Sequence, residues 1–394
     1  MVLTTLTFLL LGASAIVGST NITISISSTL SYLLPSDFQG NINQNFIDTN
    51  TSDSSVSRLF SEAQKAPFIA YDPEFLDIIG PNASLALAAE RKQPFASEAG
   101  VWVPDRNEVW FTSPTVNNTG YLYVLNLQTF NVYTANTSIP ILNPNGGYYF
   151  NEKVYITGQG SPTQPPCLYS IDPSTGETFI VVNSYFGVRL NGPNDVTWVK
   201  RGNSSYMFFT DDPLAQVYSG GEPAQLPDAV WRYDPQDQSL VPVINRGDIL
   251  VPNGIRVSRD QTKLYITDTP QIGQPGLDAA IGSWSSTAIY VYDIDEDLFP
   301  VNKRLFGLTR RGISDGIHID DFGRVWTGES EGVVVRNKKG KVIGIFNSEV
   351  TLENPSPPLE NFALAGDTLV MLDLQKIWTV KLAQTVVAPS RYYI

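Results

Sequence analysis

One pattern recurs six times along this chain and limits the folds open to it more than any other feature. Each copy reads as an alternating strand, a polar turn and a second strand that ends in small or polar residues. A further pair of strands follows each of the first five copies, as in CLYSIDPSTGETFIVV from Cys167. The copies begin at intervals of 46 to 63 residues, at Glu98, Pro144, Gly192, Val251, Ser314 and Glu360. Four strands per unit at this spacing predict the blades of a β-propeller.

The number of copies predicts an all-β fold, a six-bladed β-propeller with four-stranded blades over residues 66–385. The sixth copy ends after three strands, at KIWTVKL. We expect an N-terminal strand from residues 67–79 (PFIAYDPEFLDII) to supply the fourth, which closes the ring and removes two exposed sheet edges. Residues 19–65 are rich in Ser, Thr and Asn and predict a poorly ordered arm, and residues 386–394 form a C-terminal tail.

The N-terminus indicates export. Residues 1–18 read as a signal peptide, because the apolar run from Leu6 to Leu11 is too short to cross a bilayer and small residues follow it. Six Asn-X-Ser/Thr sequons predict N-glycosylation, at Asn21, Asn50, Asn82, Asn117, Asn136 and Asn203. We therefore expect the protein to be secreted or to reside in the lumen of the secretory pathway.

Charge and cysteine usage exclude several classes of function. The net charge of −13, from 26 basic and 39 acidic residues, argues against binding to nucleic acid or to an anionic membrane surface. Cys167 is the only cysteine, so the chain can form no internal disulfide, and we expect it to be a small buried apolar residue. Hydrophobic residues make up 42% of the chain, which is ample for a large core.

Polar residues stand at the start of the predicted inner strand of successive repeats. Because the inner strands of a propeller surround one central channel, these side chains are expected to converge at a single mouth. Any one of them alone is more simply a turn residue, but their recurrence at one place in the repeat favours a shared site. Oxygen ligands without His or Cys suit a hard cation, Ca²⁺ first and Mg²⁺ or Mn²⁺ as alternatives. The residues are Glu98, Asn145, Asn194, Asn253, Asp315 and Asn361.

The sequence contains few of the residues that other hydrolytic mechanisms require. A Ser-His-Asp triad would have to employ His318, the only histidine in the chain. A catalytic zinc site usually takes two or three His or Cys ligands, and the chain offers only His318 and Cys167. If GIHIDDF is an inner strand, His318 points away from the face shared by Asp315, Ile317 and Ile319. We therefore expect a structural His318 between blades or near a rim. A glycosidase with two carboxylates stays open, although no second acid recurs with the repeats.

Four ordered motifs resemble one known family. EAGVWVP, GPNDV…FFTDDP, PNGI…LYITDT and DGIHID…GRVW are similar to the SMP-30/gluconolactonase/luciferin-regenerating-enzyme family. The segments FIAYDPEFLDIIGPNASL and FASEAGVWVPDRNEVWFTS resemble its fungal lactonohydrolase branch. The resemblance spans about residues 67–383. It implies a six-bladed propeller that holds a divalent metal at the mouth of its channel.

The same resemblance assigns roles residue by residue. It implies that Glu98, Asn194, Asn253 and Asp315 bind the metal, Ca²⁺ first, with Mg²⁺, Mn²⁺ or Zn²⁺ as alternatives. It also makes Asp315 the general base and Asn194 a substrate contact. Two departures bear on substrate choice. Ser97 stands where fungal relatives commonly carry His, and SEGVVV at 330–335 replaces a Gly-Asp-Gly-Val type of turn.

These observations favour a metal-dependent lactonohydrolase, in which the metal polarises the ester carbonyl and Asp315 accepts a proton. Long loops at 211–228 and 269–286 are expected to flank the mouth, and Asn145, Tyr218 and Trp284 are candidate substrate contacts beside Asn194. One alternative is a pericyclase of secondary metabolism, such as a hetero-Diels–Alderase acting on a polyketide or terpenoid. Another is a propeller that binds a ligand without catalysis. The expected partner is a small-molecule lactone or a related metabolite.

Overall fold

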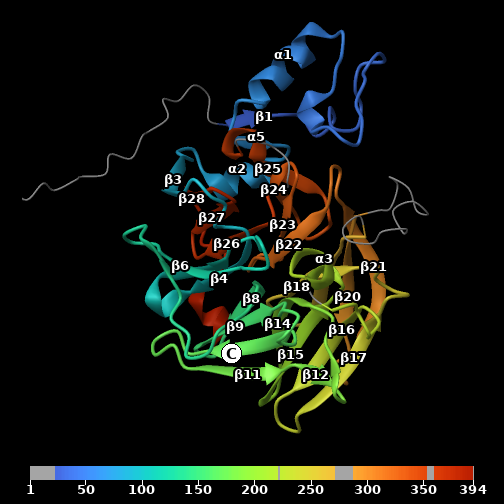
Figure 1. The fold of residues 1–394 in the computed structure, drawn as a ribbon. Helices are drawn as coiled ribbons and strands as arrows, with labels where there is room; N and C mark the ends of the chain where they lie inside the picture. Colours follow the sequence, from blue (N-terminus) through green and yellow to red (C-terminus); the bar gives the residue numbers. More distant parts are fainter. Residues whose placement is uncertain (1–22, 221, 271–286, 353–358, 394) are drawn as a thin grey trace, which may run out of the picture.

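The computed structural model describes residues 23–220, 222–270, 287–352 and 359–393, and within them the predicted propeller is present. Six antiparallel sheets of the blade type stand around a centre (Figure 1). The inner strand of each blade contacts the inner strand of the next, and β26 contacts β4 to complete the ring. The all-β six-bladed architecture is therefore confirmed.

The blades follow the chain in order, each beginning with its inner strand. The first two are β4 (Glu98–Val103), β5 (Glu108–Thr112), β6 (Leu122–Asn126) and β7 (Val132–Thr134), then β8 (Pro144–Phe150), β9 (Lys153–Gly158), β10 (Cys167–Ile171) and β11 (Thr178–Val182). The third and fourth are β14 (Pro193–Arg201), β15 (Ser204–Asp211), β16 (Ala229–Asp234) and β17 (Ser239–Asn245), then β18 (Pro252–Val257), β19 (Lys263–Asp268), β20 (Ala288–Ile294) and β21 (Pro300–Leu308). The fifth contains β22 (Ser314–Ile319), β23 (Val325–Glu329), β24 (Gly332–Arg336) and β25 (Val342–Asn347). The sixth contains β26 (Asn361–Ala365), β27 (Thr368–Asp373) and β28 (Lys376–Lys381), followed by β3 (Leu85–Glu90) from earlier in the chain.

An N-terminal strand closes the ring, but it is not the one expected. β3 pairs with β28 and completes the sixth blade. The segment 67–79 forms two other elements: β2 (Phe68–Ala70), which pairs with β25, and the helix α2 (Pro73–Ile79). The physical reason lies at Asp72, whose carboxylate accepts the Glu74 N–H and caps a helix that opens with proline. This helix start, at Asp72 and Pro73, prevents the segment from forming one long strand.

The described part of the segment 19–65 has regular structure, which differs from the poorly ordered arm expected there. Its strand β1 (Thr23–Ser25) pairs in parallel with β2, and its helix α1 (Ser54–Ala63) begins at the cap Asp53. Ile24, Ile47 and Phe60 form a buried cluster with Val334 and Ile345 of the fifth blade. In Figure 1, α1 and β1 lie beyond β24 and β25. We call residues 23–65 the N-terminal arm. Residues 1–18, the predicted signal peptide, lie outside the described residues.

The C-terminal tail joins inner strands at the ends that face away from the mouth. Its short helix η4 (Pro389–Tyr392) places Arg391 where its guanidinium donates to the carbonyl oxygens of Ile319 and, at 2.8 Å, Val257. These two carbonyls belong to the last residues of β22 and β18. The Tyr392 ring packs edge-on against Trp102 of β4. The tail is therefore an integral part of the propeller.

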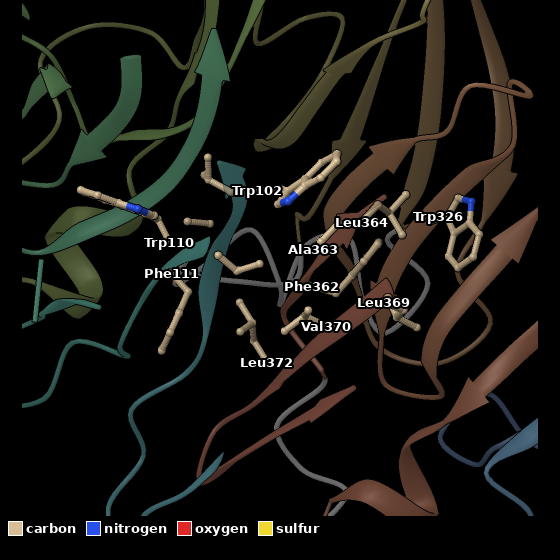
Figure 2. Close-up of a cluster of buried hydrophobic side chains, with 14 of the residues drawn as sticks. Trp102, Trp110, Phe111, Trp326, Phe362, Ala363, Leu364, Leu369, Val370 and Leu372 are labelled. Atoms are coloured by element: carbon tan, nitrogen blue, oxygen red, sulfur yellow. The ribbon is translucent and has the colours of Figure 1, made fainter. Parts of the chain in front are cut away.

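Apolar side chains fill the space between neighbouring sheets. Figure 2 shows part of this core where the first blade meets the sixth, with Trp110 and Phe111 from β5 near Val370 and Leu372 from β27. Cys167 is a buried free thiol, as predicted. Among the described residues, no helix is both long and apolar enough to cross a membrane.

Candidate functional site

All six predicted mouth residues open an inner strand. Glu98 and Asn361 are the first residues of β4 and β26, and the other four are the second residues of β8, β14, β18 and β22. Asn194, Asn253, Asp315 and Asn361 are buried. The Asn361 amide donates to Glu98 Oε2 at 2.9 Å, and the Asn253 side chain hydrogen-bonds Asp315. The ring thus brings together side chains that are far apart in the sequence.

A bulge at the start of the inner strand aims these side chains. In the first five blades the pairing register skips between the first residue of the inner strand and the fourth, as between Pro252 and Ile255. A bulge leaves its extra residues without ladder partners and bends the strand, which turns the mouth residues out of the sheet. Glycine lets neighbouring bulges approach closely. A Cβ at Gly254 would lie 2.5 Å from the Asp315 carbonyl oxygen, and one at Gly316 would lie 2.3 Å from the Asn361 side chain.

Threonine hydroxyls connect each bulge to the next. Thr267 Oγ1 accepts the N–H of Gly254 at 2.8 Å and donates to the carbonyl oxygen of Asp315 at 2.9 Å. Thr210 does the same one blade earlier, accepting from Asp195 at 3.0 Å and donating to Asn253 O at 2.6 Å. Both hydroxyls are buried. The bulges that carry Asn194, Asn253 and Asp315 are therefore held in one continuous hydrogen-bonded row.

This row extends to the earlier blades and was missed in the sequence. Thr157 donates to Asn194 O at 2.7 Å and Thr112 to Asn145 O at 3.1 Å. The signal was available, because WFT, YIT, FFT and YIT lie at or one residue before the end of the second strand in the first four repeats. The fifth blade differs, since Gly328 occupies the corresponding register and the Glu360 carbonyl would lie 2.4 Å from a Cβ there.

Acidic residues after two of these threonines fix the loops that enter the mouth. Asp211 accepts the N–H groups of Asn191 at 3.1 Å and Gly192 at 2.7 Å. Asp268 accepts the N–H of Val251 at 2.9 Å in the same way. Burial raises the pKa of Asp211 to about 7 even though these N–H groups favour its ionised form. The third and fourth blades thus each hold their own loop with a carboxylate and the next blade with a hydroxyl.

The mouth concentrates carboxyl groups with little to neutralise them. Burial, and then the charge of Asp315, raise the pKa of Glu98 well above its usual range. The pKa of Asp315 is also raised well above its usual range, first by burial and then by the charge of Glu360. The pKa of Glu360 is raised to about 8, first by burial and then by the charge of Glu98. Asp212, beside Asn194, also has a raised pKa because it is buried. No ion pair within the described part of the chain involves these four residues.

Glu360 is a mouth residue that sequence reasoning did not select. It directly precedes Asn361, and its carboxylate accepts a hydrogen bond from the Ser97 hydroxyl. Ser97 directly precedes Glu98, so the first and sixth blades meet at two adjacent positions. An acid directly before a mouth residue was visible in the sequence, although no other repeat has an acid at that position. Ser97 stands where fungal relatives commonly carry His, and its hydrogen-bond partner is Glu360.

The donor set fits a hard divalent cation. Asp315 Oδ1, Asp212 Oδ2 and Asn145 Oδ1 are buried and make no hydrogen bond to any described residue. Buried carboxylates that repel one another are stabilised by a cation placed between them. No cluster of three His, Cys, Asp or Glu suited to a metal is found within 23–393 outside the gaps, so amide oxygens must complete the set. Carboxylate and amide oxygens are ligands that Ca²⁺ accepts readily.

His318 is separated from the acids by an amide. It points away from Ile317 and Ile319, which pack between the fourth and fifth blades, as strand alternation predicts. Its ring lies 4.8 Å from that of Phe362 in the sixth blade, and the Asn361 side chain hydrogen-bonds to it. Burial, and then the charges of Arg256 and Arg391, lower the pKa of His318 well below its usual range. The imidazole is therefore neutral, and it is connected to Glu98 by two hydrogen bonds that both involve Asn361.

One stretch of the sequence does match the nucleophile pattern G-x-S-x-G, from Gly328 to Gly332. In a hydrolase elbow this serine stands between a strand and a helix. Ser330 instead occupies the tight turn between β23 and β24, where its carbonyl accepts a 2.7 Å hydrogen bond from the Ser348 hydroxyl. A Cβ at Gly312 would lie 2.3 Å from Ser330 Oγ, so that hydroxyl faces a neighbouring loop. The motif is a hairpin turn here.

The remaining substrate-contact candidates are placed unevenly. Asn145 opens β8 at the mouth. Tyr218 ends the helix α3 (Leu214–Tyr218), but its side chain lies outside what the structure describes. Trp284 and most of the loop 269–286 also fall outside the described residues.

Comparison with known proteins agrees with the geometry. The SMP-30/Gluconolactonase/LRE-like region matches residues 96–359, and the chain belongs to this family. It is 24% identical over 366 residues to lactonohydrolase oryH of Aspergillus oryzae, which covers 75% of this chain and 77% of that protein. It is 25% identical over 304 residues to the gluconolactonase of Zymomonas mobilis, covering 69% and 74%.

Solved structures share the fold. A gluconolactonase from Xanthomonas campestris superposes with a TM-score of 0.63 at 20% identity, covering 79% of this chain and 93% of that one. The calcium-binding protein regucalcin from Agrobacterium tumefaciens gives a TM-score of 0.54 at 16% identity, covering 77% and 94%. At these identities the likeness extends to the fold alone.

Proposed function

We propose that this protein is an enzyme that hydrolyses the ester bond of a small-molecule lactone with the help of a divalent cation. The observation that carries the proposal is the set Glu98, Asn194, Asn253 and Asp315 at one mouth, the last three buried, in a chain whose relatives include lactonohydrolases and a gluconolactonase. Ca²⁺ is the ion that this set of oxygen donors suits best. A cation bound there would polarise the ester carbonyl as a Lewis acid.

Asp315 is the residue we assign to proton transfer. Its Oδ1 makes no hydrogen bond to the described residues and is free to accept one from a water molecule. In hydrolysis, the water oxygen forms a bond to the carbonyl carbon while one of its protons passes to Asp315. The ring C–O bond then breaks, and the leaving alkoxide takes up that proton, which gives a hydroxy acid and regenerates the carboxylate.

The other mouth residues position the reacting groups. Thr267 holds the backbone of Asp315, and Asn361 holds Glu98. Asn194 and Asn145 offer amide groups to the substrate at the entrance of β14 and β8. Because these contacts are made by buried groups before substrate arrives, little reorganisation is needed during the reaction.

A panel of lactones of different ring size tests the proposal. Purified protein is treated with a chelator, divided, and assayed with and without added Ca²⁺, Mg²⁺, Mn²⁺ or Zn²⁺. We expect ring opening that is lost after chelation and restored by at least one ion. Unchanged turnover after complete removal of divalent metal would refute the cation requirement, and absence of turnover across the panel would refute the activity.

We also propose that the protein is secreted and N-glycosylated, as the N-terminal sequence predicts. Asn21 lies outside the described residues. The other five sequon asparagines are exposed and accessible to a glycosyltransferase, at Asn50, Asn82, Asn117, Asn136 and Asn203. Expression in a eukaryotic host followed by enzymatic deglycosylation should shift the protein to lower apparent mass. Recovery only from the cytosol, with no shift, would contradict this proposal.

A further inference from the structure

A cavity lies away from the mouth, where the N-terminal arm meets the fifth blade. It has a volume of about 150 Å³, and none of the predicted metal ligands lines it. One wall comes from the arm, with Ser31 and Phe46, and the other from the outer strands, with Val334 and Ile345. Tyr71, just after β2, lines the junction between them. The cavity therefore exists only because the arm folds onto the propeller.

The charged groups around this cavity already have partners. Arg336 Nη1 donates to Glu329 at 2.6 Å, and Arg310 Nη2 donates to Glu331 at 2.8 Å. The ammonium group of Lys341 pairs with Asp72, which does not line the cavity. A charged ligand would have to break one of these pairs, and burying an unpaired charge is costly. The existing ion pairs thus disfavour an ionic ligand in this cavity.

The groups that remain available are apolar or hydroxyl-bearing. Ser31 Oγ is buried and has no hydrogen-bond partner among the described residues. Burial raises the pKa of Tyr71, so its phenol stays neutral. At the rim, Tyr32 is 78% exposed and Leu308 is 55% exposed, which leaves large apolar side chains in water beside the opening. A ligand in the cavity would cover this rim and satisfy the serine hydroxyl.

From these observations we propose that the cavity is a binding site for a small, neutral, aromatic molecule that carries one hydroxyl, of the size of a phenol. A cavity of about 150 Å³ accommodates a benzene-sized ring, and apolar side chains make up half of the residues that line it. Phe46, Val334 and Ile345 would contact the ring, and Ser31 would hydrogen-bond the hydroxyl. This site is separate from the mouth and does not depend on the proposed hydrolysis.

The test uses the full chain with phenol and toluene as probes, measured by isothermal titration and ligand-observed NMR. Phenol should bind saturably with one equivalent per chain. Val334→Phe fills the cavity and should weaken the binding of phenol at least tenfold. Val342→Phe, from a partly exposed part of the same wall, should act in the same direction and serves if the first variant does not fold.

Ser31→Ala separates the role of the hydroxyl from that of the cavity. It should weaken the binding of phenol about threefold to tenfold, the range for one neutral hydrogen bond, and leave the binding of toluene unchanged. Ser25→Ala, on the same arm with an exposed side chain outside the cavity, is the matched control and should alter neither. Asp315→Asn should also leave phenol binding unchanged. Equal binding of phenol to the wild type and to both cavity-filling variants, or no saturable binding at all, would overturn the proposal.

Discussion

The hydroxyl of Thr267 donates a 2.9 Å hydrogen bond to the carbonyl oxygen of Asp315, a residue 48 positions later in the next blade. The hydroxyl oxygen of Thr267 also accepts the N–H of Gly254, which belongs to the same blade as Thr267. One buried hydroxyl thus sets the distance between two neighbouring bulges. Because Asn253 and Asp315 both lie in these bulges, the relative placement of two proposed metal ligands depends on Thr267.

Replacing Thr267 by valine should therefore affect both stability and turnover. The change keeps the shape but leaves a buried carbonyl and a buried N–H without partners, at a cost of about 1–3 kcal/mol for each group. We expect a lower denaturation midpoint and, at saturating metal, a fall in kcat larger than any rise in KM. Thr267→Ser, which retains the hydroxyl, is the control. If the two variants behave alike in turnover, the hydroxyl does not position Asp315.

The division of roles between Asp315 and His318 gives a second prediction. Asp315→Asn keeps the shape of the side chain but removes proton acceptance, and should lower kcat by about 10²–10⁴-fold, the usual contribution of a general base. His318→Gln should retain most turnover, because the imidazole is neutral and is reached from the acids only through Asn361. Steady-state kinetics on one lactone compare the two. The reverse order of effects would remove Asp315 from the mechanism.

The repeat predicted the ring because every blade buries its strands in the same way, so one pattern identifies all six. The closing strand was misplaced because a missing fourth strand does not show which upstream segment supplies it. Asp72 and Pro73 favour a helix locally, and that left β3 to pair with β28. The regular structure of the N-terminal arm was not predicted because Ser and Thr dominate its composition. Ile24 and Phe60 supply the buried contacts that order it.

Within the site, the residues that could be predicted were those that recur at the same place in each repeat. Asp315 and Asn253 belong to this group. Thr267 also occupies a recurring position, but its role, like that of Glu360, arises from contacts between blades and could not be assigned from the sequence. Ser97 pairs with Glu360 across 263 positions, a relationship that only the closed ring creates.

The carboxyl cluster predicts a definite dependence of stability on pH when no cation is present. Folding raises the pKa of Glu360 from 4.5 to about 8, chiefly through burial. Between these values the folded protein retains a proton that the unfolded chain has lost, so the free energy of unfolding should fall as pH rises from about 5 to about 8. Thermal unfolding of metal-free protein across this range measures the effect.

Two comparisons make that result specific. Glu360→Gln cannot ionise and should flatten the decline, although the raised pKa values of Glu98 and Asp315 will keep part of it. Saturating divalent cation should raise the melting temperature most at the alkaline end, because binding requires the ionised carboxylates. A melting temperature that does not change with pH in the metal-free wild type would contradict the proposed electrostatics of the mouth.

Arg391 offers a prediction about the opposite end of the channel. Its guanidinium satisfies the carbonyl oxygens of Ile319 and Val257, the last residues of two inner strands. Arg391→Met preserves the length of the side chain but leaves those two buried acceptors unpaired, so unfolding should become easier by about 1–3 kcal/mol per group. Asp321 would still pair with Arg259, at 2.5 Å, and is not left as a lone charge.

Denaturant unfolding measures the loss of stability in Arg391→Met. Tyr393→Phe, which alters the same tail without touching these carbonyls, is the control. Since Arg391 lies at the far ends of the strands, metal affinity and kcat should stay within about twofold of the wild type. A loss of metal binding in Arg391→Met without a loss of stability would show that the tail acts on the mouth rather than on the propeller as a whole.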